Sequence, residues 1–215
     1  MYGRAKGVVG DLLSAAGAAD KAFLATKVWI NGKASGVAQM QRSEQLLRTQ
    51  HIDLMQVHNL LDCKTHLDTL RGWKKEERIT YLGVTHYTSS AYADLEAVMR
   101  AETLDFIQIN YAADDRAAEK RILPLAADRG MAVLINRPFG GGNLLQRMSG
   151  KPLPDWAAEI DCCTWSQILL KYVLSHTAAT CAIPGTSRPQ HMRDNAEAGK
   201  GRLPDAALRA KIEAL

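Results

Sequence analysis

The chain contains few cysteines, and their spacing does not suit a disulfide framework or a metal site. None of the four belongs to a CxxC pair, and adjacent cysteines such as Cys162 and Cys163 rarely bond to each other. The six histidines follow no HExxH or similar spacing, so no metal site is expected. Buried, reduced thiols are expected instead. They favour a reducing compartment and predict a cytoplasmic protein.

Long apolar runs and clusters of one charge are also missing. No segment has the roughly 18 consecutive apolar residues of a membrane helix. The start of the chain lacks the charged-then-apolar order of a signal peptide. The formal net charge of +4 is spread along the chain without a basic run. We therefore expect neither a membrane nor a nucleic acid among the partners.

The composition is that of an ordinary globular protein. Of its 215 residues, 47% are hydrophobic and 23% are charged, and no composition break divides the chain. This predicts a single domain over residues 1–215 with one sizeable core. A helix is expected near the start, where Val8, Val9, Leu12 and Leu13 recur at helical spacing.

Short apolar runs alternate with amphipathic stretches of helical length. The early runs recur roughly every 25 to 30 residues, the length of a strand, a helix and two short loops. This pattern predicts an α/β protein with parallel strands. The expected strands are FLATKV (23–28), IDLMQVH (52–58), YLGVTH (81–86), DFIQIN (105–110), AVLINRP (132–138) and TCAIPG (180–185).

The interval between the last two expected strands is longer than the others. It holds GGGNLLQRMSGKPLPDWAAEIDCC (140–163), rich in glycine and proline, before the helical pattern WSQILLKYVLSH. We expect an extended loop with a short helix, of the kind that shapes the entrance to an active site. Because the three glycines lack GxGxxG spacing, a Rossmann phosphate loop is not expected.

Polar side chains lie at or near the carboxyl end of every expected strand. In a β/α barrel these ends converge on the face that carries the active site. Taken alone, each also has a plain structural interpretation, such as a solvated lysine at the rim or a hydrogen-bonded histidine. Their recurrence favours a functional site made of Lys27, His58, Thr85 with His86, Gln108 with Asn110, Arg137, and Gly185 with Thr186.

Two of these residues, Lys27 and His58, suit proton transfer at a carbonyl group together with Tyr2 near the start of the chain. A tyrosine has a pKa of about 10, and a neighbouring ammonium lowers it toward the working pH. A histidine beside the pair can donate a hydrogen bond to the substrate oxygen. The three residues therefore predict a centre that reduces carbonyl compounds.

Over essentially its whole length the sequence resembles the aldo-keto reductases. The resemblance rests on MYG, FLATKVW, IDLMQVHN, YLGVTHY, FIQINY, NRPFGGG and AIPGTSRPQHMRDN. It implies a TIM-type (β/α)8 barrel that binds NADPH and reduces an aldehyde or ketone through a Tyr-Lys-His-Asp tetrad. By motif, Tyr2 matches the proton donor, Lys27 the lysine that lowers its pKa, and His58 the histidine that orients the substrate.

The resemblance also implies residues at the nicotinamide end of the cofactor. Thr85 and His86 stand where family members hold the nicotinamide amide with a Ser-Asn pair, and Gln108 matches their glutamine. Asn136 stands where many relatives stack an aromatic ring on the nicotinamide. The segment NRPF, which includes Arg137 and Pro138, resembles a subgroup pattern.

At the phosphate end, the expected residues follow the last strand. Gly185, Thr186 and Ser187 are expected to open a helix whose N–H groups and hydroxyls suit a phosphate. The resemblance places His191 where the usual arginine meets the 2′-phosphate, with Arg188 nearby, and Asn195 where an asparagine contacts adenine. It implies NADPH as cofactor, with NADH as the alternative, and a small carbonyl compound as substrate.

The tetrad aspartate lies a few residues before the tyrosine in the family, and this sequence starts after that point. We therefore expect an N-terminally truncated chain with about six of the eight β/α units, which lacks the first two strands. Met1 is then an internal methionine or a truncation point, and an upstream export signal would leave no trace. The alternative, a complete six-unit protein, would have two unpaired strand edges.

Two other functions remain open. A Schiff-base barrel enzyme would use Lys27 as a desolvated nucleophile, but this reading leaves the IPGTSRPQH segment unexplained. A non-catalytic module or inactive fragment would bind NADPH without turnover.

Overall fold

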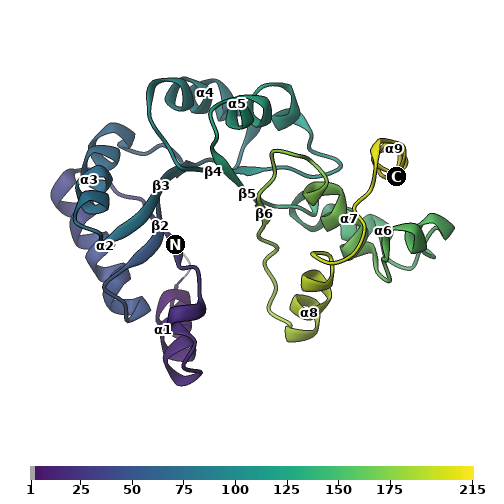
Figure 1. The fold of residues 1–215 in the computed structure, drawn as a ribbon, viewed down its shortest axis with the longest axis horizontal. Helices are drawn as coiled ribbons and strands as arrows, with labels where there is room; N and C mark the ends of the chain where they lie inside the picture. Colours follow the sequence, from purple (N-terminus) through teal and green to yellow (C-terminus); the bar gives the residue numbers. More distant parts are fainter. Residues whose placement is uncertain (1–2) are drawn as a thin grey trace. The chain divides into compact units, whose positions relative to one another are not determined.

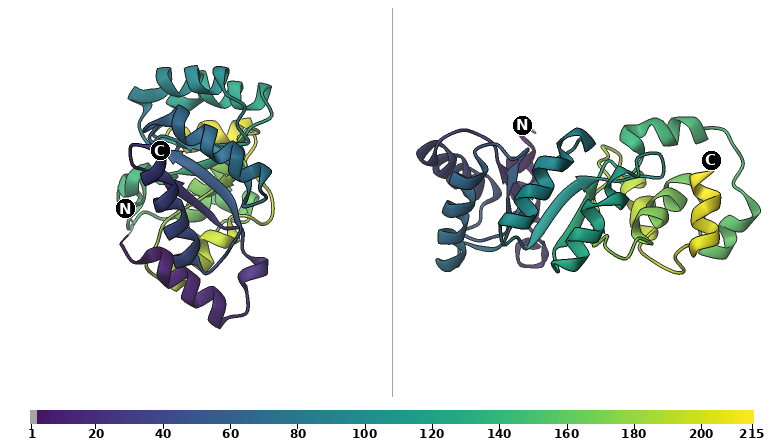
Figure 2. Two further views of the ribbon diagram at one scale, coloured as in Figure 1. Left: turned by 90° about the vertical axis from the view of Figure 1, so that its left-hand side faces the viewer. Right: turned by 90° about the horizontal axis from the view of Figure 1, so that it is seen from above.

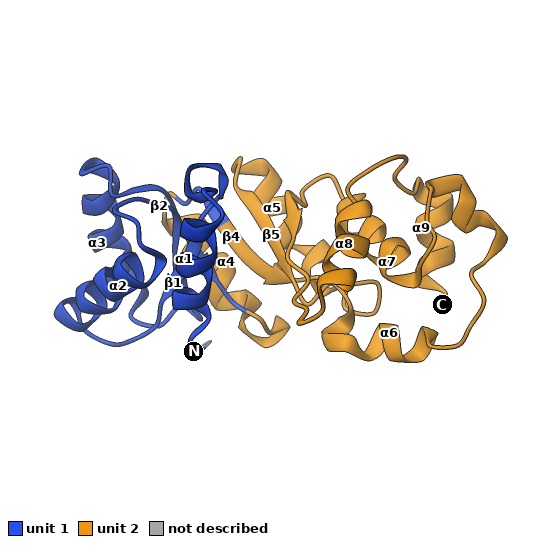
Figure 3. Cartoon of the chain, turned by 90° about the horizontal axis from the view of Figure 1, so that it is seen from below, with its two compact units in different colours: residues 1–86, 104–106 blue, residues 87–103, 107–215 orange. Residues whose placement is uncertain are grey.

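The computed structural model describes residues 3–215, which form two compact units (Figure 3). The first unit comprises residues 1–86 and 104–106, and the second comprises residues 87–103 and 107–215. Tyr2, the predicted proton donor, lies outside the described residues. The single domain over residues 1–215 stays a prediction.

Strands and helices alternate along the described chain, which confirms the expected α/β class (Figure 1). The strands are β1 (Ala25–Val28), β2 (Ile52–His58), β3 (Ile79–Thr85), β4 (Phe106–Asn110), β5 (Ala132–Asn136) and β6 (Cys181–Ala182). The α-helices are α1 (Ala5–Ala15), α2 (Lys33–Leu47), α3 (Cys63–Lys75), α4 (Tyr92–Ala101), α5 (Ile122–Asp128), α6 (Asn143–Met148), α7 (Trp165–Leu174), α8 (Pro189–Glu197) and α9 (Ala206–Glu213). No helix within residues 3–215 is long and apolar enough to cross a bilayer.

In the first unit, β2 lies between β1 and β3, and both pairings are parallel. Side chains on both faces of β2 are buried, among them Leu54, Met55 and Val57, as is usual for a parallel strand covered on two sides. Helices α2 and α3 pack against these strands, and α1 packs against α2 (Figure 2). Gly10 allows the close approach of α1, because a Cβ there would lie 2.3 Å from the Leu46 carbonyl oxygen.

In the second unit, the strands follow the order β4-β5-β6, and β5 and β6 are parallel. Helix α7 is buried along most of its length, and Thr164 caps its N-terminus by accepting a hydrogen bond from the Gln167 amide. The core of this unit includes Ile107, Ile109, Val133, Ile135 and Ile168.

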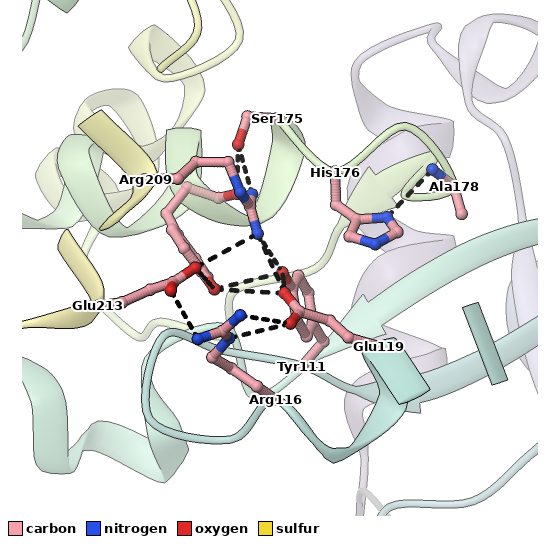
Figure 4. Close-up of polar contacts among 9 residues, drawn as sticks. Tyr111, Arg116, Glu119, Ser175, His176, Ala178, Arg209 and Glu213 are labelled. Atoms are coloured by element: carbon pink, nitrogen blue, oxygen red, sulfur yellow. Dashed lines mark hydrogen bonds and ion pairs between the residues drawn. The ribbon is translucent and has the colours of Figure 1, made fainter. Parts of the chain in front are cut away.

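The C-terminal helix α9 is held by a cluster of polar contacts around Arg209 (Figure 4). The Arg209 guanidinium donates to the Tyr111 hydroxyl (2.8 Å) and the Glu119 carboxylate (3.1 Å). It also lies over the Tyr172 ring, 4.2 Å from the centroid. Further contacts join Arg116 to Glu119 and Glu213, Tyr172 to Glu213, and Arg209 to Ser175.

Several details differ from the sequence-based expectations. Strand β3 begins at Ile79, two residues earlier than expected, and β6 has only two residues. Strand β5 ends at Asn136 because Arg137 adopts a positive φ of 51°. The four cysteines, all within residues 3–215, form no disulfide; Cys162 is buried and Cys63 is partly exposed, whereas the expectation of buried thiols was wrong for the exposed Cys163 and Cys181.

Candidate functional site

The carboxyl ends of β1, β2 and β3 bring Lys27, His58 and Thr85 to one edge of the first unit. Lys27 is the register partner of Gln56, two residues before His58, and His58 is the partner of Thr85. Side chains in register share a face of the sheet. The His58 Nδ1 atom lies 3.1 Å from the Thr85 Oγ1 atom, within hydrogen-bond distance. These three predicted residues therefore form one cluster.

Positive charge dominates this strand-end cluster. Burial lowers the pKa of Lys27, and the nearby Lys6 ammonium lowers it further. Burial, together with Lys27 and His86, lowers the pKa of His58 to about 4. His58 is therefore neutral near pH 7. If it accepts the Thr85 hydroxyl proton at Nδ1, its Nε2 carries a proton and can donate to a ligand.

An aromatic side chain that was not among the predicted site residues lies beside His58. The Trp29 ring meets the His58 ring edge-on, with centroids 5.4 Å apart and an interplanar angle of 86°. The Gln39 amide fixes the Trp29 backbone by accepting from its N–H (2.5 Å) and donating to its carbonyl (3.3 Å). Trp29 stands two residues after Lys27, and this proximity was the available sequence signal.

Several buried polar atoms near strand ends have no hydrogen-bond partner within residues 3–215. They include both amide atoms of Gln56 in β2 and the Oδ1 atoms of Asn59, directly after β2, and of Asn136, at the end of β5. Gln56 was not predicted as a site residue. Its neighbours in β2 are mostly apolar, and its lack of partners cannot be read from a sequence.

A cavity of about 770 Å³ lies in the second unit, beside α8 and the loop after β5. Its lining contains the predicted cofactor residues Arg137, Pro138, Gly185, Thr186, His191 and Asn195. Ser187 and Arg188 are exposed and do not belong to this lining. The lining also includes residues that were not predicted, among them Gly141, Gly142, Thr164, Ser166 and Asp194.

Glycines shape one wall of this cavity. Gly140, Gly141 and Gly142 have positive φ angles of 59°, 72° and 104°, a conformation that glycine adopts without strain. A Cβ at Gly141 would lie 2.6 Å from a terminal nitrogen of the Arg137 guanidinium, so the absence of a side chain lets the guanidinium lie over this loop. The run of three glycines was the available signal for the wall.

A second part of the cavity lining lies directly before α8 and along it. The helix starts at Pro189, with Arg188 as its N-cap. The expectation that Gly185, Thr186 and Ser187 open the helix was therefore wrong, because these residues form the turn that precedes it. The Thr186 hydroxyl accepts a hydrogen bond from the Arg188 amide (3.1 Å) in this turn.

One carboxylate, that of Asp194, lines the described part of the cavity. It accepts hydrogen bonds from the Thr164 hydroxyl (2.9 Å), the Gln167 amide (2.7 Å) and the Ser166 hydroxyl. The Asp194 carboxylate oxygens therefore accept hydrogen bonds from side chains at the N-terminal end of α7. Arg137 and His191 are the basic side chains of the lining, which suits an anionic ligand.

The remaining predicted residues lie in or directly after strands. Gln108 is buried in the middle of β4, Asn136 ends β5, and His86 directly follows Thr85 at the end of β3. Within residues 3–215 no group of His, Cys, Asp or Glu side chains is arranged to hold a metal ion.

The alternating helices and parallel strands, with polar side chains at the carboxyl ends of β1, β2 and β3, define a β/α protein. In proteins of this class the functional side chains lie at such strand ends. The chain belongs to the aldo/keto reductase family, whose sequence model matches residues 1–214.

Individual relatives agree with this membership. The chain is 27% identical over 159 residues to the uncharacterized oxidoreductase C215.11c of Schizosaccharomyces pombe, covering 73% of this chain and 50% of the relative. It is 26% identical over 161 residues to the aldo-keto reductase YhdN of Bacillus subtilis, covering 69% and 48%. The chain thus spans about half the length of these relatives.

Solved structures share the fold. The holo form of aldo-keto reductase AKR11C1 from Bacillus halodurans matches with a TM-score of 0.77 at 23% identity, covering 97% of this chain and 76% of that chain. An aldo/keto reductase from Klebsiella pneumoniae, in complex with NADP and acetate, matches with a TM-score of 0.82 at 23% identity, covering 98% and 75%.

Proposed function

We propose that this chain carries the machinery of an NADPH-dependent reductase that converts an aldehyde or ketone into an alcohol. The observation that carries the proposal is the cavity of the second unit, in which six predicted cofactor residues gather. Membership of the aldo/keto reductase family supports it, as does the NADP bound to the related Klebsiella pneumoniae protein. A small carbonyl compound is the proposed substrate.

The cavity residues fit a phosphorylated dinucleotide. Arg137 and His191 offer positive or donor groups, and Thr186 and Asn195 add polar side chains. Gly141 leaves space under the Arg137 guanidinium, where a Cβ would clash at 2.6 Å. The Asp194 carboxylate is occupied by side chains of the α7 segment, so it opposes a phosphate less than a free carboxylate would. When bound, NADPH supplies the hydride.

The strand-end cluster supplies the proposed proton chemistry. We assign proton donation to Tyr2 and the lowering of the tyrosine pKa to the Lys27 ammonium. Neutral His58 would donate from Nε2 to the substrate oxygen, while Thr85 holds its Nδ1 atom. We further assign His86, Gln108 and Asn136 to the nicotinamide end of the cofactor, and Ser187 and Arg188 to the phosphate end.

The proposal is tested by titrating the chain with NADPH, followed by cofactor fluorescence, and then adding 4-nitrobenzaldehyde. Replacing Arg137 with Ala should weaken NADPH binding about 10-fold or more, because a charged hydrogen-bond donor is lost. The control Lys200→Ala removes an exposed cation of the same unit and should leave the affinity unchanged. Lys27→Met should abolish cofactor oxidation without weakening binding.

The outcomes separate the alternatives. Binding without oxidation by the unmodified chain would favour a non-catalytic NADPH-binding module. A lack of binding, or equal affinity for the Arg137→Ala variant, would contradict the cavity assignment.

A Schiff-base enzyme is a second candidate, because burial and Lys6 lower the pKa of Lys27, as a nucleophilic lysine requires. Borohydride reduction in the presence of the aldehyde, followed by peptide mass analysis, tests it. A reductase predicts no selective adduct at Lys27, whereas a selective adduct that is lost in Lys27→Met would support the second candidate.

A further inference from the structure

The loop between β1 and α2, residues 29–32, is tied to the start of α3 by two side chains. In this β1–α2 loop, the Gly32 N–H donates to the Asp62 carboxylate (2.7 Å). The Ile30 carbonyl oxygen lies 2.6 Å from the His66 Nε2 atom, and because a carbonyl only accepts, this nitrogen carries the ring proton. Two backbone groups of the loop thus have side chains of a later helix as their partners.

Neither of these two side chains serves its own helix in the usual way. Asp62 is the N-cap residue of α3, yet its carboxylate accepts no hydrogen bond from the backbone of that helix. His66 is 0% exposed, and its Nδ1 atom has no partner within residues 3–215. An apolar side chain of similar size would avoid burying an unpaired nitrogen. The contacts with the loop therefore account for an aspartate and a histidine at these positions.

The β1–α2 loop also carries the Trp29 ring, which lies against His58. The two ring centroids are 5.4 Å apart. Trp29 is 44% exposed, while Gln39 of α2 binds both its backbone N–H and its carbonyl. The loop thus presents an aromatic ring, almost half of it open to solvent, to the side of a proposed functional residue.

We propose that Asp62 and His66 are positioning residues, which act on the reaction by holding the β1–α2 loop. The loop in turn keeps the Trp29 ring against His58 and so restricts the rotation of the histidine. This inference rests on the proposed function for the role of His58, but the contacts themselves do not. With Thr85 at its Nδ1 atom and Trp29 against its ring, His58 is fixed for an oriented hydrogen bond to the substrate oxygen.

The first arm of the test follows the two rings by NMR and requires no turnover. The four tryptophans are labelled with 5-fluorotryptophan, and the Trp29 signal is assigned by its loss in Trp29→Phe. Histidine labelled with 13C at Cε1 reports on His58, whose signal is assigned by its loss in His58→Gln. In Asp62→Ala and in His66→Leu, both signals should move toward their values in the urea-unfolded chain.

Two further variants serve as controls. Asp68→Ala also removes a carboxylate from α3, but an exposed one that pairs with Lys64 and Arg71, so it should leave both signals in place. His66→Gln should keep them closer to their original values than His66→Leu does, because the glutamine amide can still donate to the Ile30 carbonyl.

Unchanged Trp29 and His58 signals in Asp62→Ala would overturn the proposal, because the contact would then be structural alone. Asp62→Ala decides the question if His66→Leu does not fold, since Asp62 is only partly buried.

The second arm uses NADPH and 4-nitrobenzaldehyde. Asp62→Ala should lower kcat/KM about 10-fold without weakening NADPH binding, because a displaced donor meets the substrate oxygen less often in a productive geometry. Asp68→Ala should leave kcat/KM unchanged. An unchanged kcat/KM in Asp62→Ala would overturn the role in the reaction. Absence of NADPH oxidation by the unmodified chain would bear only on the proposed function, and the two NMR signals would still decide the positioning.

Discussion

The strand-end cluster around Lys27 and the cluster around Arg209 are both rich in polar groups, but they differ in how these groups are paired. The Arg209 guanidinium donates to the Tyr111 hydroxyl, the Glu119 carboxylate, the Ser175 hydroxyl and the Tyr172 carbonyl. Near Lys27, both amide atoms of Gln56 and the Oδ1 atom of Asn59 have no partner within residues 3–215. A cluster that pairs its own groups stabilises the fold, whereas unpaired groups remain available to a ligand.

The charges differ in the same way. Burial alone would raise the pKa of Glu119, but hydrogen bonds from Arg116 and Tyr111 and the nearby arginines lower it overall. Near Lys27, the charged groups within residues 3–215 that act beside burial are cationic: Lys6 lowers the pKa of Lys27, and Lys27 lowers that of His58. In the Arg209 cluster, positive and negative groups are therefore paired with each other. The strand-end cluster has an excess of positive charge, which suits a developing negative charge on a substrate.

The largest change in stability is expected when the Arg209 cluster is disrupted. Arg209→Ala should lower the free energy of unfolding by about 3 kcal/mol, because it leaves Glu119 and the Tyr111 hydroxyl partly buried without their donor. Urea unfolding followed by circular dichroism measures the change.

The matched control is Arg202→Ala, which removes an exposed ion pair with Asp205. Its expected effect is about 0.5 kcal/mol or less. If both variants lose the same small amount of stability, the Arg209 cluster is not a structural element and the contrast between the two clusters fails.

A smaller effect is expected at His66, which combines features of both clusters. Its Nε2 atom lies 2.6 Å from the Ile30 carbonyl oxygen, while its Nδ1 atom is buried without a partner within residues 3–215. Gly36→Ala would place a Cβ 2.4 Å from the His66 ring, which cannot move without losing the Ile30 contact. We expect a loss of about 1–2 kcal/mol in urea unfolding.

Gly72 provides the control for this substitution. It also lies inside a helix of the first unit, but a Cβ there meets no atom within 4 Å. Gly72→Ala should therefore stabilise the protein by about 0.5–1 kcal/mol through helix propensity. A gain of stability in Gly36→Ala as well would mean that packing does not hold the His66 ring.

The sequence predicted the β/α alternation because apolar runs and helical periodicity are local signals. It also placed Lys27, His58 and Thr85 at the ends of neighbouring strands, because a polar residue at the end of an apolar run is visible in the sequence. The start of α8 was misplaced although Pro189, a typical first helical residue, was a usable signal.

Other features depend on three-dimensional packing. Thr164 and Asp194 line one cavity but are 30 residues apart, and nothing local relates them. The Gln56 amide has no hydrogen-bond partner within residues 3–215 because no donor or acceptor of a neighbouring element reaches it. The spacing of residues in the sequence does not show this. Trp29 stands two residues after the predicted Lys27, but its edge-on contact with His58 is formed only in the folded chain, where Gln39 hydrogen-bonds to the Trp29 backbone.

The smallest expected effect is the contribution of His58 to the pH dependence of stability, which tests the charge difference between the two clusters. The pKa of His58 is about 4 in the folded chain, against about 6.5 when unfolded, so between these values the unfolded state binds more protons. His58 thus makes the free energy of unfolding rise with pH in this window, and the stability is lost as pH falls from about 6.5 toward 4. The difference between pH 7 and pH 5 should shrink in His58→Gln by about 1 kcal/mol or less, because the ring is only partly buried and solvent screens its charge. Urea unfolding at the two pH values measures it, with His191→Gln, a change of an exposed histidine, as the control. An unchanged pH dependence in His58→Gln would show that burial, Lys27 and His86 do not together lower the His58 pKa, and the excess positive charge proposed for the strand-end cluster would then have to be rejected.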